Sequence, residues 1–200
     1  MKKHLISHYV FLTFACIVAL SLPAQSSGRF QGRIITEPLP DGRNLRVVQP
    51  FTFIDIKGSE WHVPRNTVTD GASVPRFLWS IFPPFSGKYR IAAVVHDRYC
   101  QIRKKSWRSV HRMFFDAMIA SGVDKVTART MYAAVYSFGP RWSLLGATRA
   151  PKWSSLQDDQ QAEAFEALQL WIARENPTRQ EIESRIKETG IRELGAKTLE

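Results

Sequence analysis

The sequence has little cysteine, no long apolar segment and few acidic residues for its number of basic ones. Two cysteines in 200 residues exclude a small disulfide-dense scaffold. The eleven glycines and eleven prolines follow no period, which excludes a collagen-like chain. The longest apolar run, residues 9–20, is shorter than the ~18 residues that a membrane-spanning helix needs. The hydrophobic content of 44%, with six Trp and twelve Phe, indicates a folded chain with a core.

Residues 1–26 are predicted to be a secretory signal peptide. Two lysines precede the apolar run, Pro23 interrupts it, and the small residues Ala24 and Ser26 follow. We therefore expect a periplasmic or secreted protein that has no transmembrane segment after cleavage. Cys16 leaves with the signal, so Cys100 is expected to be a single, buried and unpaired thiol.

Charge divides the rest of the chain into two regions. Residues 27–150 hold 19 Lys and Arg against 8 Asp and Glu, whereas residues 151–200 hold 7 against 10. We predict a mixed β/helical core domain over 27–150 and a helical appendage over 151–200. The favoured interpretation is that the appendage is solvated, and the alternative is that it packs on the basic core or on a partner. The net charge of +10 favours anionic partners.

Residue patterns predict an α+β fold. Residues 44–56 and 60–63 are rich in β-branched and aromatic residues, so we expect a small N-terminal antiparallel sheet. Apolar residues at helical spacing predict helices over 88–104, 107–120 and 125–138, joined by short loops as antiparallel neighbours. Two polar amphipathic helices are expected after residue 154, the second beginning at Pro177 and Thr178.

Ionisable residues stand inside these apolar patterns, namely His96 and Asp97 in the first predicted helix and His111 in the second. Buried groups of this kind cost free energy unless they are paired or functional. Adjacent helical residues point about 100° apart, so His96 and Asp97 cannot reach one atom from the same direction, but they can flank a cavity, with one contacting a substrate and the other a cation. Asp70 and Gly71 form a turn, and a turn can supply the carboxylate and carbonyl oxygens that calcium prefers.

Each of these residues also has a structural interpretation. His96 is equally well explained as a core histidine, and His111 as a polar contact between helices. Asp97 could act as a cap or pair with Arg98 or Arg76. Asp70 could cap a helix that begins near residues 73–75.

The motifs around these residues carry a family resemblance. Residues 45–142 contain a TDGAS-P run from Thr69, an AA-x-x-HD helix from Ala92 and a Y-x-A-V-x-x-F-G segment from Tyr132. This region resembles a domain-of-unknown-function family that is common in phage and proteobacterial proteins. The family label carries no established activity.

The same order of motifs is more distantly similar to the helical core of prokaryotic secreted phospholipase A₂. This resemblance implies a phospholipase-like three-helix core in which His96 is the general base that takes a proton from water. It also implies that Asp70, Asp97 and the Gly71 carbonyl bind a calcium ion, which polarises the ester carbonyl.

The chain departs from the phospholipases beside the general base. His111 stands where those enzymes have an aspartate that orients the catalytic histidine, and a neutral imidazole offers no negative charge there. Asp116 is a candidate substitute, but its expected role is an ion pair with Arg112 at i−4.

Two functions from different classes follow. One is a secreted cell-envelope protein with a divergent or degenerate calcium-dependent, phospholipase-like ester hydrolase site. The alternative is a non-catalytic binding or structural module in which the His–Asp group is a packed polar network. A metal-dependent cell-wall hydrolase ranks last, since such a site needs more histidine ligands and an open coordination position.

The expected partners are an anionic lipid surface or an envelope component. The basic residues between 98 and 112 form either a solvated face or a contact with such a surface. Nucleic acid is not an expected partner, because the sequence contains no recognised binding module.

Overall fold

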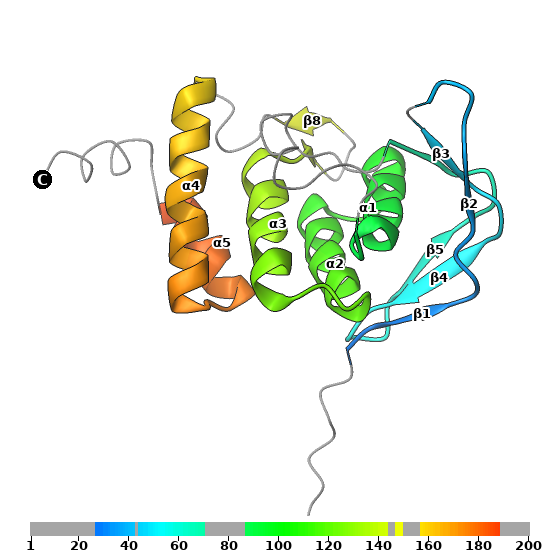
Figure 1. Cartoon of the computed structure of the whole chain (residues 1–200), viewed down its shortest axis with the longest axis horizontal. Coiled ribbons are helices and arrows are strands. Elements are labelled where there is room, and N and C mark those ends of the chain that lie inside the picture. Colours follow the sequence, from blue (N-terminus) through cyan, green and yellow to red (C-terminus); the bar gives the residue numbers. More distant parts are fainter. Residues whose placement is uncertain (1–26, 43, 71–86, 144–146, 150–156, 189–200) are drawn as a thin grey trace, which may run out of the picture.

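The computed structural model describes residues 27–42, 44–70, 87–143, 147–149 and 157–188. Short strands dominate the N-terminal half of this described part and helices dominate the rest, so the fold is α+β as predicted (Figure 1). The expected signal peptide, Gly71 and the segment that Asp70 could cap lie outside the described residues.

The strands form two small antiparallel sheets and a ribbon. The first sheet has the order β1-β4-β5, from β1 (Arg29–Gln31), β4 (Phe51–Ile54) and β5 (Glu60–Val63). The second has the order β2-β3-β6, from β2 (Thr36–Pro38), β3 (Leu45–Val47) and β6 (Val68–Thr69). The ribbon pairs β7 (Arg141–Trp142) with β8 (Thr148–Arg149), and the sequence patterns did not predict it.

The predicted strand segment 44–56 is two strands in different sheets. The chain bends at residues 48–50, where Pro50 has no N–H to donate to a ladder. In the first sheet Phe53 pairs with Trp61 and Phe51 pairs with Val63. All four side chains are buried, so this face of the sheet contributes to the core.

Three helices form the centre of the molecule, α1 (Arg90–Ile102), α2 (Trp107–Ala120) and α3 (Lys125–Phe138). The last two have the predicted bounds, and the first lies within its predicted range. Capping side chains explain where α2 and α3 begin. The Ser106 side chain accepts a hydrogen bond from the Ser109 N–H, and the Asp124 side chain accepts one from the Thr127 N–H.

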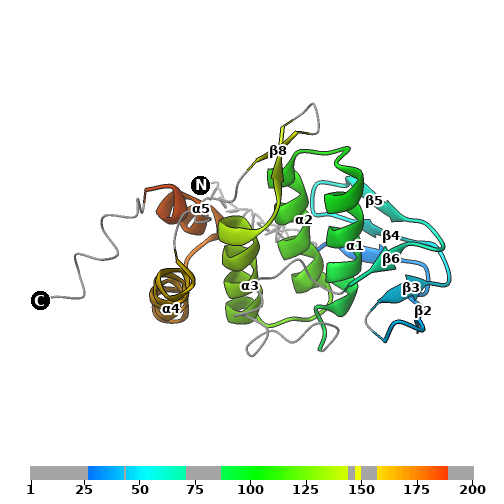
Figure 2. The ribbon, with the colours of Figure 1, turned by 90° about the horizontal axis from the view of Figure 1, so that it is seen from above.

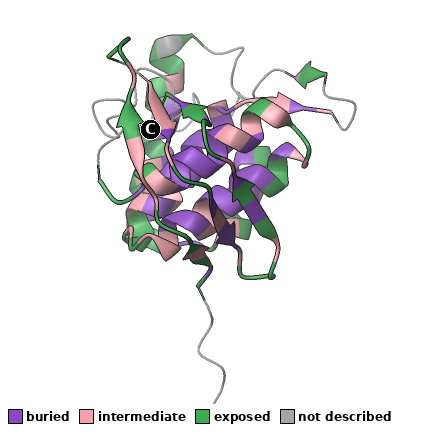
Figure 3. Ribbon diagram, turned by 90° about the vertical axis from the view of Figure 1, so that its right-hand side faces the viewer, coloured by how far each residue is buried: buried purple, intermediate pink, exposed green. Residues whose placement is uncertain are grey.

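The helices separate the sheets from the C-terminal helices. Figures 1 and 2 show the sheets beside α1 and α2, with α4 (Asp158–Glu175) and α5 (Arg179–Glu188) beyond α3. In Figure 3, which looks at the sheet side, buried residues run along the central helices behind the strands. No described helix combines the length and the apolar character needed to cross a membrane.

The C-terminal helices share the core of the preceding region. Phe165 and Ile172 of α4 and Ile182 and Ile186 of α5 are almost fully buried and belong to the same apolar cluster as α1 to α3. The interpretation of this region as a solvated appendage is therefore wrong, and its alternative, packing on the basic region, is what the structure has. Residues 150–156, where the boundary was expected, lie outside the described residues.

Candidate functional site

Helices α1 and α2 bring His96 and His111 into direct contact. Nε2 of His96 lies 2.9 Å from Nδ1 of His111, so one ring donates a hydrogen bond to the other. The two residues are only 1% and 0% exposed. The pair is packed between aromatic rings, with Phe114 4.7 Å from His96 and Trp107 5.5 Å from His111 between ring centroids. The short loop between the helices explains this meeting of residues 15 positions apart.

Asp97 lies on the other side of His96 and is tied to a strand. The Thr69 hydroxyl of β6 donates a hydrogen bond to Oδ2 of Asp97. Oδ1 of Asp97 is 3.9 Å from Nδ1 of His96, which is close enough for electrostatic interaction but too long for a hydrogen bond. The two nitrogens of His96 thus face different groups, a histidine on one side and a carboxylate on the other.

A cavity of about 410 Å³ lies beside this carboxylate. It brings Asp70 and Asp97, the two carboxylates among the predicted calcium ligands, to one place. Its lining residues are Asn44, Val68, Asp70, Asp97, Cys100, Gln101 and Arg103. His96 does not line the cavity itself but lies directly behind Asp97 and Cys100, which do.

Cys100 is part of the site, although the sequence predicted only an unpaired buried thiol. It is free and partly buried. Its Sγ lies 3.6 Å from Nε2 and 3.9 Å from Nδ1 of His96. The donor atoms of His96, Cys100 and His111 all lie within 4.8 Å of one another, so three groups that can bind a metal ion converge here. The i, i+4 spacing of His96 and Cys100 on α1 is the signal that could have found this group.

Burial keeps all three groups neutral. It lowers the pKa of His96 to about 3 and, together with the neighbouring His96, lowers the pKa of His111. Burial and then the Asp97 charge raise the pKa of the Cys100 thiol. At neutral pH both imidazoles can accept a proton or bind a metal ion, but each holds an added proton only weakly.

The tautomers of the pair follow from the contacts. If Nδ1 of His96 is to accept a proton, Nε2 must carry the hydrogen and donate it to Nδ1 of His111. Nε2 of His111 then carries a hydrogen, which makes no hydrogen bond of good geometry in the described residues but has the Pro140 backbone carbonyl as a nearby acceptor. Gly139, the last residue of the Y-x-A-V-x-x-F-G segment, leaves space beside the His111 ring. A Cβ at this position would lie 3.2 Å from Nε2 of His111 and 2.3 Å from the Val135 carbonyl oxygen.

The predicted ion pair between Arg112 and Asp116 is wrong, because α5 supplies a different partner to each residue. Nε and Nη2 of Arg112 donate to both oxygens of Glu183, at 2.8 and 2.6 Å. Arg179 donates to Asp116 at 2.9 Å. Nothing in the local sequence around Arg112 indicates a partner 71 positions away.

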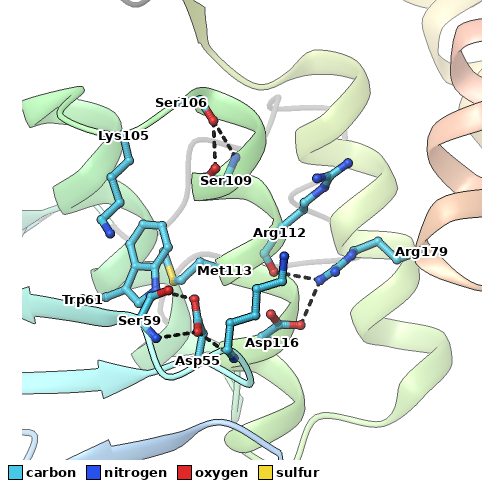
Figure 4. A pocket seen from close by; sticks show the side chains of 11 residues that line it. Asp55, Ser59, Trp61, Lys105, Ser106, Ser109, Arg112, Met113, Asp116 and Arg179 are labelled. Carbon is cyan, nitrogen blue, oxygen red and sulfur yellow. Dashed lines mark hydrogen bonds and ion pairs between the residues drawn. The ribbon is translucent and has the colours of Figure 1, made fainter.

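A second cavity of about 350 Å³ lies between the β4–β5 turn, α2 and α5 (Figure 4). Most of its charged side chains are engaged within the protein. Arg179 pairs with Asp116, Lys105 lies over the Trp61 ring, and Asp55 accepts from the Trp61 Nε1–H. We therefore regard it as a structural junction. Several cations of the basic run between 98 and 112 are likewise used in packing.

Comparison with known proteins identifies the region but not an activity. Residues 45–135 match a family model described as Protein of unknown function (DUF1353). This match confirms the expected resemblance to a domain-of-unknown-function family, and all three motifs begin inside it. No solved structure matches the chain.

Two curated relatives from Sinorhizobium fredii are also similar to this chain. Uncharacterized protein y4iH is 43% identical over 96 residues, which are 48% of this chain and 40% of the relative. Uncharacterized protein y4jT is 37% identical over 150 residues, which are 72% of this chain and 43% of the relative. The chain thus spans less than half the length of each of these relatives. Their names give no activity, and the phage relation and the phospholipase similarity stay predictions.

Proposed function

We propose that this chain is a divergent calcium-dependent ester hydrolase of the cell envelope, with His96 as its general base. One observation carries the proposal. Nε2 of His96 is bonded to His111, while Nδ1 faces Asp97 beside the cavity that also contains Asp70. A ring that is oriented through one nitrogen leaves the other available to take a proton from water.

The oxygen donors around the cavity suit a calcium ion. Asp70 and Asp97 supply carboxylates, and the Gly71 carbonyl follows directly in the chain. Asn44 lines the same cavity, and its amide nitrogen donates to Asp41, so its amide oxygen is left as an acceptor. When bound, calcium would supply the positive charge that polarises an ester carbonyl.

His111 limits the activity that this arrangement can support. It fixes the orientation of His96, but as a neutral ring it does not stabilise the imidazolium that forms when His96 takes a proton. Burial, which lowers the pKa of His96 to about 3, weakens the base further. We therefore expect slow hydrolysis, because a general base works best with a pKa near the working pH.

The substrate would be a lipid or another ester that meets the protein in the periplasm or outside the cell. Arg103 lines the same cavity, and its positive charge there favours a substrate that carries an anionic group. An anionic lipid surface would satisfy this preference, and the net charge of +10 favours the same partner.

Calcium titration by calorimetry tests the metal part of this proposal. Asp70→Asn and Asp97→Asn should each lose most of the calcium affinity, because each removes one of two anionic ligands. Asp159→Asn, which changes an exposed carboxylate on α4, is the matched control and should bind calcium as the parent does. A double Asp70, Asp97 variant that is folded and still melts with the calcium dependence of the parent would refute the site.

The second candidate is a non-catalytic binding or structural module, and the burial of the histidine pair favours it. His96 and His111 are closed off by packed aromatic rings, as in a polar network that stabilises a helix pair. In this case His96→Gln changes stability alone, and the protein hydrolyses no ester with calcium bound.

A further inference from the structure

His96, Cys100 and His111 form a donor group that the ester hydrolase proposal uses only in part. His96 and Cys100 are one turn apart on α1, so they lie on one face of that helix, and α2 places His111 against them. Their donors are two imidazole nitrogens and a thiol sulfur. Such donors suit zinc and similar divalent ions, whereas calcium takes oxygen ligands.

Two of the three separations between the donor atoms are close to those of a tetrahedral zinc site, and the third, between Sγ of Cys100 and a His111 ring nitrogen, is at most 4.8 Å. With Zn–N near 2.0–2.1 Å and Zn–S near 2.3 Å, the nitrogens lie about 3.3 Å apart and nitrogen and sulfur about 3.5 Å apart. Here Sγ of Cys100 lies 3.6 Å from Nε2 of His96, and that nitrogen lies 2.9 Å from Nδ1 of His111. The two nitrogens must therefore move apart by about 0.4 Å, and Sγ of Cys100 and Nδ1 of His111 must lie about 3.5 Å apart, which side-chain rotations of Cys100 and His111 can supply.

The surroundings of the group also suit a metal ion. Asp97 lies near Nδ1 of His96, at 3.9 Å, and Thr69 holds that carboxylate in place. At this distance the carboxylate forms no hydrogen bond with the ring, but its negative charge favours the tautomer with the hydrogen on Nδ1, which leaves Nε2 of His96 for a metal ion. Cys100 lines the cavity of about 410 Å³, which provides a path for the ion and room for a water.

We propose that Nε2 of His96, Nδ1 of His111 and Sγ of Cys100 bind one zinc ion, with a water from the cavity as the fourth ligand. The Cys100 S–H bond breaks as the Zn–S bond forms, so one proton is released to solvent for each ion bound. The hydrogen shared between the two rings moves to a nitrogen that faces away from the metal. Each imidazole then stays neutral, with N–H at Nδ1 of His96 and at Nε2 of His111.

This zinc site does not depend on the ester hydrolase proposal. The two use His96 in exclusive ways, since a zinc-bound His96 carries its hydrogen on Nδ1 and cannot take a second proton there. If both hold, zinc inhibits the hydrolase. Calcium ligands and zinc ligands are different residues, so each site can be tested without the other.

Cobalt titration of the full chain in a Cys16→Ser background tests the zinc site, because Cys100 is then the single thiol. Co²⁺ should bind one ion per chain with thiolate-to-cobalt charge-transfer absorption, and Zn²⁺ should abolish that absorption by displacement. Cys100→Ser should remove the charge-transfer band and lower the zinc affinity by more than about 100-fold. His62→Ala is the matched control, because His62 is an exposed histidine on β5, and it should change neither result.

Zinc should also protect Cys100 from a disulfide reagent, which gives a second readout that needs no histidine variant. His96→Ala and His111→Ala remove packed rings and can unfold the protein. The comparison of Cys100→Ser with the parent is therefore the deciding test of the zinc site. A folded parent without cobalt–thiolate absorption, or a Cys100→Ser variant with unchanged zinc affinity, overturns the proposal. Calcium affinity should be retained in Cys100→Ser, so a failure of the zinc site leaves the calcium site standing.

Discussion

Replacing Glu183 with glutamine should destabilise the fold although the residue lies far along the chain from the motifs. Glu183 is only 3% exposed and joins α5 to α2 and α3. Its carboxylate accepts two hydrogen bonds from Arg112 and one of 2.6 Å from the Tyr132 hydroxyl. Burial acts to raise the pKa of Glu183, but the bonds from Arg112 and Tyr132 outweigh it and lower the pKa.

The magnitude follows from what each partner loses. Hydrogen bonds to a charged group contribute about 1.5–3 kcal/mol, and leaving a buried donor unpaired costs about 1–3 kcal/mol. Tyr132 is fully buried and cannot turn to water, whereas the Arg112 side chain is 44% exposed and can be solvated. Glutamine keeps one acceptor oxygen. We therefore expect Glu183→Gln to lower the free energy of unfolding by about 2–3 kcal/mol.

Urea unfolding at pH 7, followed by tryptophan fluorescence, measures this loss. Glu175→Gln is the matched control, because Glu175 pairs with Arg174 on the surface with side chains 51% and 78% exposed. This exposed pair should contribute less than about 1 kcal/mol. Equal unfolding midpoints for the two variants would contradict the conclusion that α5 is an integral part of the core.

Three further predictions concern the histidine pair and the N-terminus. Between pH 6.5 and about 3, His96 binds a proton in the unfolded chain but not in the folded protein, so the free energy of unfolding should fall as the pH falls, by up to about 4–5 kcal/mol. Urea titrations at several pH values measure this dependence, and a flat profile would contradict the buried neutral pair. His111→Asp should increase calcium-dependent esterase activity, since general-base assistance is worth about 10²–10⁴ in rate. If His111 is only a packing residue, the variant will instead be inert and less stable by about 1–3 kcal/mol or more. Mass spectrometry of exported protein should find an N-terminus between residues 26 and 28, and an intact Met1 in the periplasm would exclude signal cleavage.

Local patterns predicted the elements that position the site. Apolar periodicity and capping residues are properties of neighbouring positions, so the helices over 107–120 and 125–138 could be predicted. The contact between His96 and His111 follows from two such helices joined by a short loop. The motif residues Asp70 and Asp97 line one cavity, as the calcium hypothesis requires, although that placement does not by itself test calcium binding.

Partners that are distant in sequence could not be predicted in the same way. Arg112 appeared to have its partner one turn away in Asp116, but Glu183 lies 71 positions further on and supplies two oxygens to the guanidinium. The burial of Ile182 and Ile186 depends on the same long-range packing. Charge counts described the C-terminal region as polar and did not reveal this apolar face.

Ester hydrolysis by the full chain tests the central claim most directly. We predict that the folded protein hydrolyses short-chain or micellar esters with calcium and that a chelator stops the reaction. His96→Gln should abolish hydrolysis while it retains calcium affinity, because Asp70 and Asp97 are unchanged. A calcium-bound wild-type protein that hydrolyses none of these esters, or a His96→Gln variant as active as the wild type, would contradict the claim that His96 is a general base.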